Sequence, residues 1–452
     1  MTPQPLPRVL IVGGGFAGIA AAKALAGAPV QVTLIDRRNH HVFQPLLYQV
    51  ATASLSPADI SAPIRSVLRA QQNCDVVLAE ITGVDVANRR LIAANGHIGY
   101  DYLILAAGAT HAYFGHDDWA AIAPGLKTIE DATELRRRIL LAFESAEHEG
   151  SDQARRAVLT FGIVGGGPTG VELAGAIQEI AGKTLPRDYR HIDTRTTRVL
   201  LFEGGPRLLE TFTPGLSDRA HRDLERMGVE VRVNSRVTGI TPQGVSIGDE
   251  FIPVRNVFWA AGVRACPLGH SLGVPLDRAG RIIVGADLAI PGHPEVFVAG
   301  DMAAAKSADT GKTVPGVAQG GMQMGHYVGH TIANETRARS RGTTPGPRTP
   351  FVYRDKGSMA VIGKAKGVAQ IGGLRFGGFI AWLLWGGIHI AFLINFRNRV
   401  QVLLSWFWNW LLNARDARLI TGDARLDIQT PRPGEFVPGE VPVPATTRES
   451  GE

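Results

Sequence analysis

Two segments of the chain have the glycine spacing of a dinucleotide-binding turn. The first runs from Gly13 to Gly18 after the apolar residues 9–12, and the second runs from Gly165 to Gly170 after residues 160–164. In a GxGxxG turn the first glycine lets the chain reverse, the second lets a pyrophosphate approach the backbone, and the third lets the helix pack on the strand. Amide groups at the start of the following helix then face the phosphates. Two copies in the same strand–turn–helix context predict two dinucleotide sites.

An acidic residue follows each turn at the end of a second apolar run. Asp36 comes 23 residues after Gly13, and Glu203 comes 38 residues after Gly165. A carboxylate in this position accepts hydrogen bonds from ribose hydroxyls and repels the 2′-phosphate of NADPH. The second site is therefore expected to prefer NADH, although Arg207 nearby leaves NADPH open. The alternative interpretation is that each acid only closes a surface strand.

Two repeated α/β units must position these residues. Gly108 ends an apolar run 95 residues after Gly13, and Gly262 ends another 97 residues after Gly165. Units of nearly equal span, each built around the same turn, predict two Rossmann-type dinucleotide-binding domains in tandem.

The composition limits the other possibilities. The chain has 452 residues, enough for two or three domains, and its 45% hydrophobic and 19% charged residues exclude a mostly disordered protein. Cys74 and Cys266 are its only cysteines, which excludes a disulfide framework and a CxxC redox pair. The first residues lack the apolar run of a secretory leader, so we expect the catalytic part to stay in the cytoplasm.

The segment after the second unit makes a family resemblance specific. Glu295–Asp301 is an apolar strand that ends in the pair Gly300 and Asp301. With the two units before it, this segment resembles the two-dinucleotide-domain flavoprotein reductases. The resemblance implies that the first unit holds FAD and that the second, inserted in the first, holds the nicotinamide dinucleotide. It also implies that Gly300 and Asp301 contact the ribityl and phosphate region of the flavin, the alternative for Asp301 being a simple turn residue.

The C-terminal region is apolar and rich in tryptophan. Residues 376–396 carry no formal charge, and five of the seven tryptophans fall between 382 and 410. Tryptophan favours the headgroup level of a membrane, where an apolar ring and a polar N–H are both accommodated. Residues 376–396 are long enough to span a bilayer. Their four glycines and the following Arg397 and Arg399 instead favour a pair of helices lying in the membrane surface.

The net charge of +6 is concentrated beside this apolar region. Residues 335–418 hold thirteen lysines and arginines against three acidic side chains. A basic stretch next to a tryptophan-rich hairpin attracts anionic lipid headgroups. Because the basic residues accompany no helix-turn-helix, zinc finger or similar module, we expect a membrane lipid surface as partner and no nucleic acid.

Longer stretches of sequence are similar to one family of such reductases. Residues 38–52 (RNHHVFQPLLYQVAT), 170–175 (GVELAG), 317–323 (VAQGGMQ) and 357–364 (GSMAVIGK) resemble type II NADH dehydrogenase, the non-proton-pumping NADH:quinone oxidoreductase. The resemblance covers roughly residues 8–415, although Gly321 stands where the family usually has alanine. It implies bound FAD, NADH as substrate and a quinone as acceptor. It further implies a homodimer that is peripheral or monotopic on the cytoplasmic side of the cell inner membrane.

Four polar residues are candidates for the chemistry. Glu172 begins the second nucleotide helix, and the resemblance implies a role at the junction of NADH and quinone, with complementing the helix dipole as the alternative. Gln319 and Gln323 share one helix face, which the resemblance puts against the flavin ring, and surface or capping glutamines are the alternative. Lys364 is a further candidate near this site, with a solvated lysine as the alternative.

These interpretations assign most of the chain. The residues assigned to FAD are Gly13, Gly14, Gly15, Phe16, Ala17, Gly18, Asp36, Arg37, Ala107, Gly108, Gly300, Asp301, Ala318 and Gln319. Those assigned to NADH are Gly165, Gly167, Pro168, Gly170, Glu203 and Gly262. The predicted domains are 1–120 with 285–335 for FAD, 121–284 for NADH, 336–420 for membrane association and the quinone site, and 421–452 as a flexible tail.

Other functions are compatible with parts of this pattern. One is a soluble FAD-dependent reductase of the ferredoxin or rubredoxin type, and another is a non-catalytic NADH-binding signalling flavoprotein. A metal site is not expected, because the pairs His40 with His41 and His326 with His330 have no third ligand in the sequence.

Overall fold

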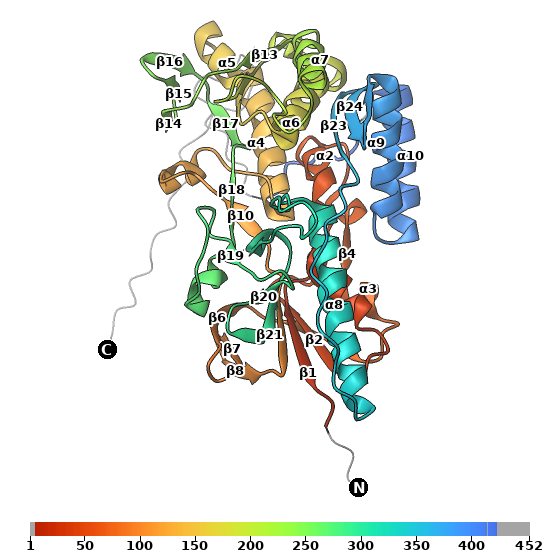
Figure 1. The fold of residues 1–452 in the computed structure, drawn as a ribbon. Coiled ribbons are helices and arrows are strands. Elements are labelled where there is room, and N and C mark those ends of the chain that lie inside the picture. The colour runs from red at the N-terminus through yellow and green to blue at the C-terminus, as the bar shows by residue number, and fades with distance from the viewer. Residues whose placement is uncertain (1–4, 414, 423–452) are drawn as a thin grey trace, which may run out of the picture.

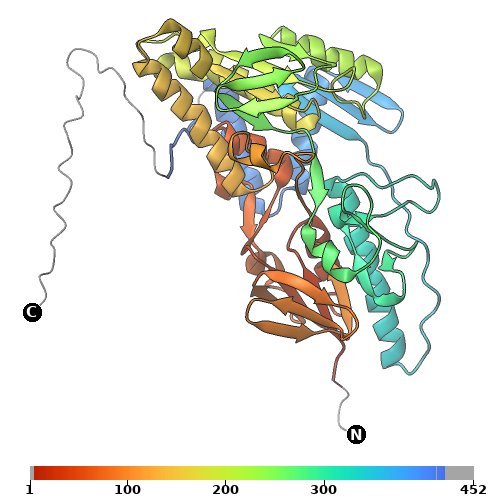
Figure 2. The same cartoon turned by 90° about the vertical axis from the view of Figure 1, so that its left-hand side faces the viewer.

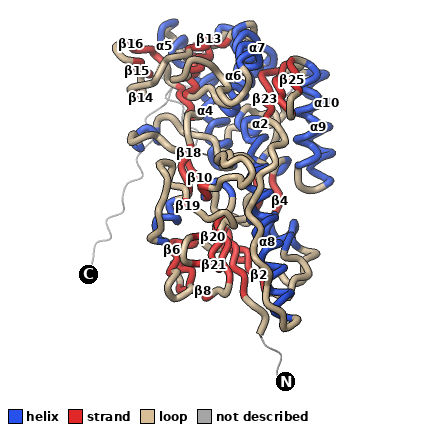
Figure 3. Tube along the Cα trace, viewed as in Figure 1, coloured by secondary structure: helices blue, strands red, loops and turns tan. Residues whose placement is uncertain are grey.

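Two α/β units follow one another along the molecule, and a C-terminal hairpin of two helices lies against the second unit (Figure 1). The computed structural model describes residues 5–413 and 415–422. Strands occupy the centre of each unit and helices cover them (Figure 3). The flexible tail predicted for residues 421–452 falls, from residue 423 onward, outside the described residues.

The first unit is built on a six-stranded sheet. In spatial order its strands are β20 (Ala289–Ile290), β21 (His293–Val298), β9 (Tyr102–Leu105), β1 (Arg8–Val12), β2 (Gln31–Asp36) and β5 (Cys74–Leu78). All neighbours except β20 and β21 are parallel, and β1 is fully buried apart from Arg8, as expected for a central strand. Because β21 pairs with β9, the chain returns to the first sheet after completing the second unit, as the family resemblance implies.

Two helices of this unit cross at very short range. They are α1 (Phe16–Ala24), which follows the first glycine turn, and α8 (Ala318–Ser340). A Cβ atom on Gly325 of α8 would lie only 2.1 Å from the carbonyl oxygen of Ala17, so glycine is required for this crossing. The smaller elements of the unit are β3 (His40–Val42), β4 (Ser61–Pro63), α3 (Ile64–Leu68), β6 (Ile81–Asp85), β7 (Arg90–Ala93), β8 (Gly96–Gly99), β19 (Ile282–Ile283) and β22 (Ala303–Ala304). Helix α2 (Leu47–Ala51) belongs to the same part of the chain but packs in the core of the second unit.

The second unit repeats the arrangement on a smaller scale. Its parallel sheet has the order β13 (Val229–Arg232), β12 (Arg198–Phe202), β11 (Thr160–Val164) and β17 (Asn256–Trp259). Its helices are α4 (Ile129–His148), α5 (Asp152–Val158), α6 (Pro168–Glu179) and α7 (Pro214–Glu225), and a small antiparallel sheet is formed by β14 (Gly239–Thr241), β15 (Gly244–Ile247) and β16 (Glu250–Pro253). A π-helical turn, Ile180–Thr184, continues α6.

Two paired strands connect the units. They are β10 (Ala109–His111) and β18 (Val263–Ala265), which run antiparallel between the two bodies in Figures 1 and 2. Trp119 packs with the core of the second unit, whereas Leu268 and Leu272 pack with the core of the first. Core packing therefore places the crossovers at these strands, earlier than the predicted boundaries at 121 and 285.

The C-terminal region contains a sheet as well as helices. It comprises β23 (Ser358–Gly363), β24 (Lys366–Ile371), β25 (Leu374–Gly377), α9 (Phe379–Phe392) and α10 (Phe396–Leu412). The expected pair of helices is present as α9 and α10. The signature 357–364 before them forms a strand that packs on α6. Residues 376–396 are not one helix: Gly378 and Asn395 adopt positive φ angles of +69° and +72° and separate β25, α9 and α10. Helix α8 extends to Ser340, beyond the predicted boundary at 335.

The hairpin of α9 and α10 exposes apolar side chains. On α10 these include Val400, Leu404, Trp408 and Leu411, whose spacing puts them on one face of the helix. Among residues 5–413 and 415–422, no helix combines the length and the apolar character needed to cross a bilayer.

Candidate functional site

The first glycine turn has the geometry that the sequence predicts. Gly13 adopts φ +109°, and a Cβ on Gly18 would lie 1.8 Å from the carbonyl oxygen of Gly13, so the start of α1 packs directly on the turn. Gly15 is different, since no atom lies within 4 Å of a Cβ placed there. The turn is therefore tight at Gly13 and Gly18 and leaves open space at Gly15, which fits a pyrophosphate approaching the backbone amides.

The end of β2 completes this site. Asp36 accepts hydrogen bonds from the backbone N–H groups of Gly14, at 2.6 Å, and Arg38, at 2.7 Å. A carboxylate has about four acceptor positions, so two backbone bonds orient Asp36 and leave capacity for ribose hydroxyls. Beside the turn lies a cavity of about 530 Å³, whose lining includes the predicted residues Gly13, Gly14, Gly15, Phe16, Ala17, Asp36, Arg37, Ala107, Gly108, Gly300, Asp301 and Ala318. We call it the nucleotide cavity.

Other residues of the nucleotide cavity were not found from the sequence. Lys127 lies 3.9 Å from Asp301, and Thr128 caps α4 by accepting from the backbone N–H of Asp131, so the start of this helix faces the cavity. Arg264 lies in the return strand β18, and Cys266 directly follows it. The pairing of β10 with β18 brings these two residues to the cavity. In the sequence, only their position near the end of the second unit indicated them.

The second glycine turn matches the first. Gly165 adopts φ +115°, a Cβ on Gly170 would lie 1.8 Å from the oxygen of Gly165, and Gly167 again has open space. Glu203 accepts from the N–H groups of Gly166, at 2.7 Å, and Gly205, at 2.6 Å. The two carboxylates thus accept equivalent backbone hydrogen bonds in the two units.

Pro168 and Gly262 flank this second turn. Pro168 occupies the first position of α6, where its missing N–H costs no hydrogen bond. Gly262 lies under the ring of Phe114, which would stand 2.5 Å from a Cβ at that position. The residues assigned to NADH line neither the nucleotide cavity nor the apolar cavity described next.

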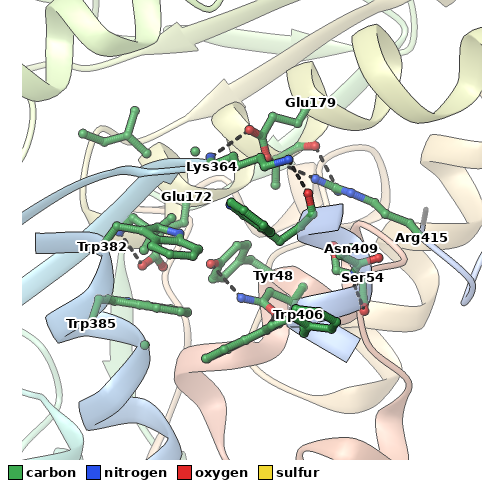
Figure 4. Close-up of a pocket in the computed structure, with 18 of the residues that line it drawn as sticks. Tyr48, Ser54, Glu172, Glu179, Lys364, Trp382, Trp385, Trp406, Asn409 and Arg415 are labelled. Carbon is green, nitrogen blue, oxygen red and sulfur yellow. Dashed lines mark hydrogen bonds and ion pairs between the residues drawn. The ribbon is translucent and has the colours of Figure 1, made fainter. Parts of the chain in front are cut away.

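A second cavity, of about 500 Å³, lies between α6, β23 and the C-terminal hairpin. We call it the apolar cavity. Four tryptophans line it, from α9 and α10, together with Tyr48, Gln49 and Glu172 (Figure 4). The four are Trp382, Trp385, Trp406 and Trp410. One short segment of the chain lines both cavities. Gln44 faces the nucleotide cavity, and Tyr48, four residues later, faces the apolar cavity.

Glu172 is the buried carboxyl of the apolar cavity. Only 9% of the residue is exposed, and its Oε1 accepts from the backbone N–H of Val361 at 3.3 Å. Burial raises the pKa of Glu172 to about 8, against the lowering effect of hydrogen bonds from Val361 and Trp385. The carboxyl is therefore mostly protonated at neutral pH and ionises at mildly alkaline pH.

Lys364 ties the hairpin to the body of the protein. Its Nζ donates to the carbonyl oxygen of Trp410 at 2.6 Å and to Oδ1 of Asn413 at 3.2 Å, both at the end of α10. Its backbone N–H donates to Glu179 at 2.8 Å, and the same carboxylate pairs with buried Arg415 at 3.4 Å. These contacts close the polar end of the apolar cavity.

Gln319 and Gln323 hold a neighbouring loop. Gln319 donates to the carbonyl oxygen of Gly357 and accepts from the N–H of Lys356, while Gln323 makes the same pair of bonds with Arg354. Both amides are thus engaged with backbone at 2.9–3.0 Å, and neither residue lines either cavity. Gln319 was also assigned to FAD, but it is Val317, Ala318 and Gly321 at the start of α8 that face the nucleotide cavity.

The polar residues of the apolar cavity that the sequence did not assign include Tyr48, Gln49, Glu179 and Arg415. Tyr48 and Gln49 belong to the stretch 38–52 that carried the family resemblance, so a signal was present without a role. Glu179 lies seven residues after Glu172 on α6, which puts both on one face of the helix. Within the described part of the chain, no group of three or more His, Cys, Asp or Glu side chains gathers as a metal site would require.

Comparison with known proteins bears on both the fold and the site. Residues 7–325 match the family described as pyridine nucleotide-disulphide oxidoreductase, and residues 356–416 match the NDH2 C-terminal domain. The chain is 45% identical over 442 residues to the type II NADH:quinone oxidoreductase Ndh of Mycobacterium tuberculosis, covering 93% of each protein. It is 44% identical to NdhA of the same organism, covering 92% of this chain and 89% of that one.

Solved structures share the architecture. The structure of NDH2 from Plasmodium falciparum in complex with NADH superposes with a TM-score of 0.82 at 20% identity, covering 92% of this chain and all of that one. The sulfide:quinone oxidoreductase of Aquifex aeolicus gives a TM-score of 0.67 at 18% identity, covering 87% and 92%.

Proposed function

The chain belongs to the pyridine nucleotide-disulphide oxidoreductases and, within them, to the type II NADH:quinone oxidoreductases, and from this we propose how its own residues serve the reaction. It is an enzyme that uses FAD to pass electrons from NADH to a quinone. Bound FAD accepts a hydride from NADH and returns two electrons to the acceptor, while the protein supplies binding, orientation and charge.

The observation that carries the proposal is the apolar cavity beside the nucleotide cavity. A quinone ring is flat and apolar with two carbonyl oxygens, and it fits a space lined by tryptophans and a few polar groups. The connecting segment from Gln44 to Tyr48 touches both cavities, so an acceptor in the apolar cavity lies next to the nucleotide cavity. The paired helices that line it also expose apolar residues outward, which suits an acceptor that arrives from lipid.

We propose that the first glycine turn and Asp36 bind FAD, and that Asp301 with Lys127 holds its ribityl and phosphate region. The second turn and Glu203 bind NADH. The start of α8 faces the nucleotide cavity, and its helix dipole stabilises negative charge on the reduced flavin. Gln319 and Gln323 act by holding residues 354–357 in place, and Lys364 acts by fixing the end of α10.

We further propose that the hairpin of α9 and α10 lies in the cytoplasmic surface of the cell inner membrane without crossing it. The exposed apolar face of α10 and the surplus of basic residues between 335 and 418 support this attachment. A homodimer is part of the same proposal and rests on the family resemblance.

The function is tested by comparing two acceptors on the full-length holoenzyme. NADH oxidation is measured with a quinone, which requires the apolar cavity, and with ferricyanide, a small ion that takes electrons without protons. Trp382→Ala enlarges the apolar cavity and is expected to raise the KM for quinone about tenfold while ferricyanide reduction stays unchanged. Equal loss with both acceptors, or none with quinone, would contradict the assignment of the cavity.

Ionisation of Glu172 is expected to cause the fall of kcat for quinone reduction at alkaline pH, the alkaline limb of the pH profile. Because burial raises the pKa of this carboxyl to about 8, its protonated form predominates below that pH and is lost above it. If the protonated carboxyl supplies a proton to the quinone, kcat falls as the pH rises through about 8. Glu172→Gln cannot release a proton, so it is expected to lower kcat about a hundredfold and to remove this limb.

The matched control for Glu172 is Glu179→Gln, at the other end of the same cavity. Its oxygens are paired with Lys183 and Arg415, so the variant is expected to keep the alkaline limb. Steady-state kinetics between pH 6 and about 10 with quinone and with ferricyanide provide the measurement. An unchanged profile for Glu172→Gln would show that the limb has another source.

Glu203 is expected to set the coenzyme preference. Glu203→Gln keeps a group that bonds ribose hydroxyls but removes the charge that repels a 2′-phosphate, so the ratio of kcat/KM for NADH to that for NADPH should fall about tenfold. Asp36→Asn, the equivalent change in the first unit, is expected to leave this ratio unchanged. A ratio that moves equally in both variants would argue against the assignment of the second turn to NADH.

A further inference from the structure

Tyr48 presents a hydroxyl to the apolar cavity in an orientation fixed by its neighbours. The residue is 6% exposed, and its oxygen accepts a hydrogen bond from Nε2 of Gln49 at 3.0 Å. Oε1 of Gln49 in turn accepts from the indole N–H of Trp406 at 2.7 Å. The three side chains form one chain of hydrogen bonds from α10 to the cavity, and Figure 4 shows Tyr48 and Trp406, its two ends.

The donor groups decide the direction of this chain. An indole N–H only donates, so the oxygen of the Gln49 amide must face Trp406 and the NH₂ group must face Tyr48. The tyrosine oxygen is therefore an acceptor toward Gln49, and its own proton has to point elsewhere. Among the described residues no oxygen or nitrogen accepts that proton, and the hydroxyl lines the apolar cavity next to Glu172 (Figure 4).

The segment that carries Tyr48 is also where α10 docks. Asn398 donates to the carbonyl oxygens of Ala58 and Ser61, Asn409 to that of Ser54, and Arg415, just after α10, to that of Thr52. Together with Trp406 these residues all bond to residues 49–61. These hydrogen bonds hold the residues directly after Tyr48 in a fixed position relative to the hairpin.

We propose that Tyr48 donates a hydrogen bond to a carbonyl oxygen of the bound quinone, and that Trp406 is a positioning residue that keeps this donor aimed through Gln49. The inference rests on the proposed function of the apolar cavity. A donor held against the carbonyl oxygen stabilises the negative charge that develops there as electrons arrive, at no cost for reorienting solvent. Burial holds the pKa of Tyr48 well above its usual range, so the residue keeps its proton and acts only as a hydrogen-bond donor. The protons that complete the quinol come from other groups.

Four variants of the full-length holoenzyme test this role. Tyr48→Phe removes the donor, and Trp406→Phe keeps an aromatic ring in the cavity but frees the Gln49 amide to turn. Trp408→Phe is the matched control, because Trp408 is on the same helix, is half exposed and does not line the cavity. The double variant Tyr48→Phe/Trp406→Phe separates positioning from packing.

The expected results differ for the two roles. With quinone, Tyr48→Phe should lower kcat about a hundredfold and Trp406→Phe about tenfold, whereas Trp408→Phe should match the parent protein. The double variant should be no slower than Tyr48→Phe alone, since Trp406 acts through the tyrosine. A ferricyanide assay on each variant reports that the flavin end is intact.

A spectroscopic readout independent of turnover completes the test. The infrared carbonyl stretch of a ¹³C-labelled quinone should shift to lower frequency on binding, and this shift should be lost in Tyr48→Phe. Quinone turnover within twofold of the parent in Tyr48→Phe, an unchanged carbonyl band, or an additive loss in the double variant would overturn the inference. If the parent protein itself binds and reduces no quinone, the proposed function fails instead.

Discussion

Gly18→Ala is expected to produce a protein without bound flavin, whereas Gly170→Ala is expected to keep its flavin and fail to react with NADH. Both glycines are the third of their turn, and in both a Cβ atom would lie 1.8 Å from the carbonyl oxygen of the first glycine. A distance that short requires the helix to move away from the turn, and the amides at its start then no longer meet the phosphates. The same one-atom change is thus made at two equivalent places.

The measurements for this pair are flavin content and NADH oxidation. The flavin absorbance of purified Gly18→Ala should fall to about a tenth of that of the parent or less, because the displaced helix no longer holds the phosphates of FAD. Gly170→Ala should retain its flavin, whose absorbance should be bleached by dithionite but not by NADH. Gly215→Ala on α7, where no atom lies within 4 Å of the added Cβ, is the control for glycine replacement and should behave like the parent, because Gly215 lines neither cavity. Loss of flavin in Gly170→Ala instead of Gly18→Ala would reverse the assignment of the two units.

A second large effect is expected at the outer face of α10. Leu404 and Leu411 are 58% and 54% exposed and line neither cavity. If this face rests in lipid, Leu404→Asp/Leu411→Asp removes two apolar contacts worth about 1.5–3 kcal/mol each and adds charge that anionic headgroups repel. Binding to vesicles of anionic phospholipid should therefore weaken by about a hundredfold or more.

Sedimentation with vesicles measures this binding, and a second pair of substitutions controls for surface charge. Leu78→Asp/Ile92→Asp places the same charges on exposed apolar residues of the first unit and should leave vesicle binding unchanged. Ferricyanide reduction by NADH should persist in both double variants, because neither touches the nucleotide sites. Retained vesicle binding in the α10 variant would contradict attachment through this hairpin.

The dinucleotide sites could be predicted from the sequence because their geometry is local. A GxGxxG turn specifies its own backbone conformation within six residues, and a carboxylate at the end of the next parallel strand necessarily returns to that turn. Asp36 and Glu203 occupy equivalent positions for this reason, each bonded to the residue after the first glycine of its turn, Gly14 or Gly166. The apolar, tryptophan-rich hairpin was also visible as a composition change.

What the sequence left undecided depends on contacts between distant segments. It singled out Gln319 and Gln323 for their spacing, but the fold engages both amides with the loop 354–357. It treated residues 376–396 as one apolar segment, but positive φ angles at Gly378 and Asn395 divide it. The domain boundaries likewise depend on which hydrophobic core each side chain joins. The hydrophobic periodicity of the sequence does not indicate which core that is.

The sequence by itself determined that this protein holds two dinucleotides and carries an apolar, basic end, because each property is written in neighbouring residues. Only the tertiary structure brought Tyr48, Glu172 and Trp406 around one cavity, from parts of the chain more than a hundred residues apart. Their roles depend on burial, which shifts the pKa of Glu172, and on which atom donates to which, which fixes the hydroxyl of Tyr48. Both are properties of three-dimensional packing, and no single stretch of residues contains them.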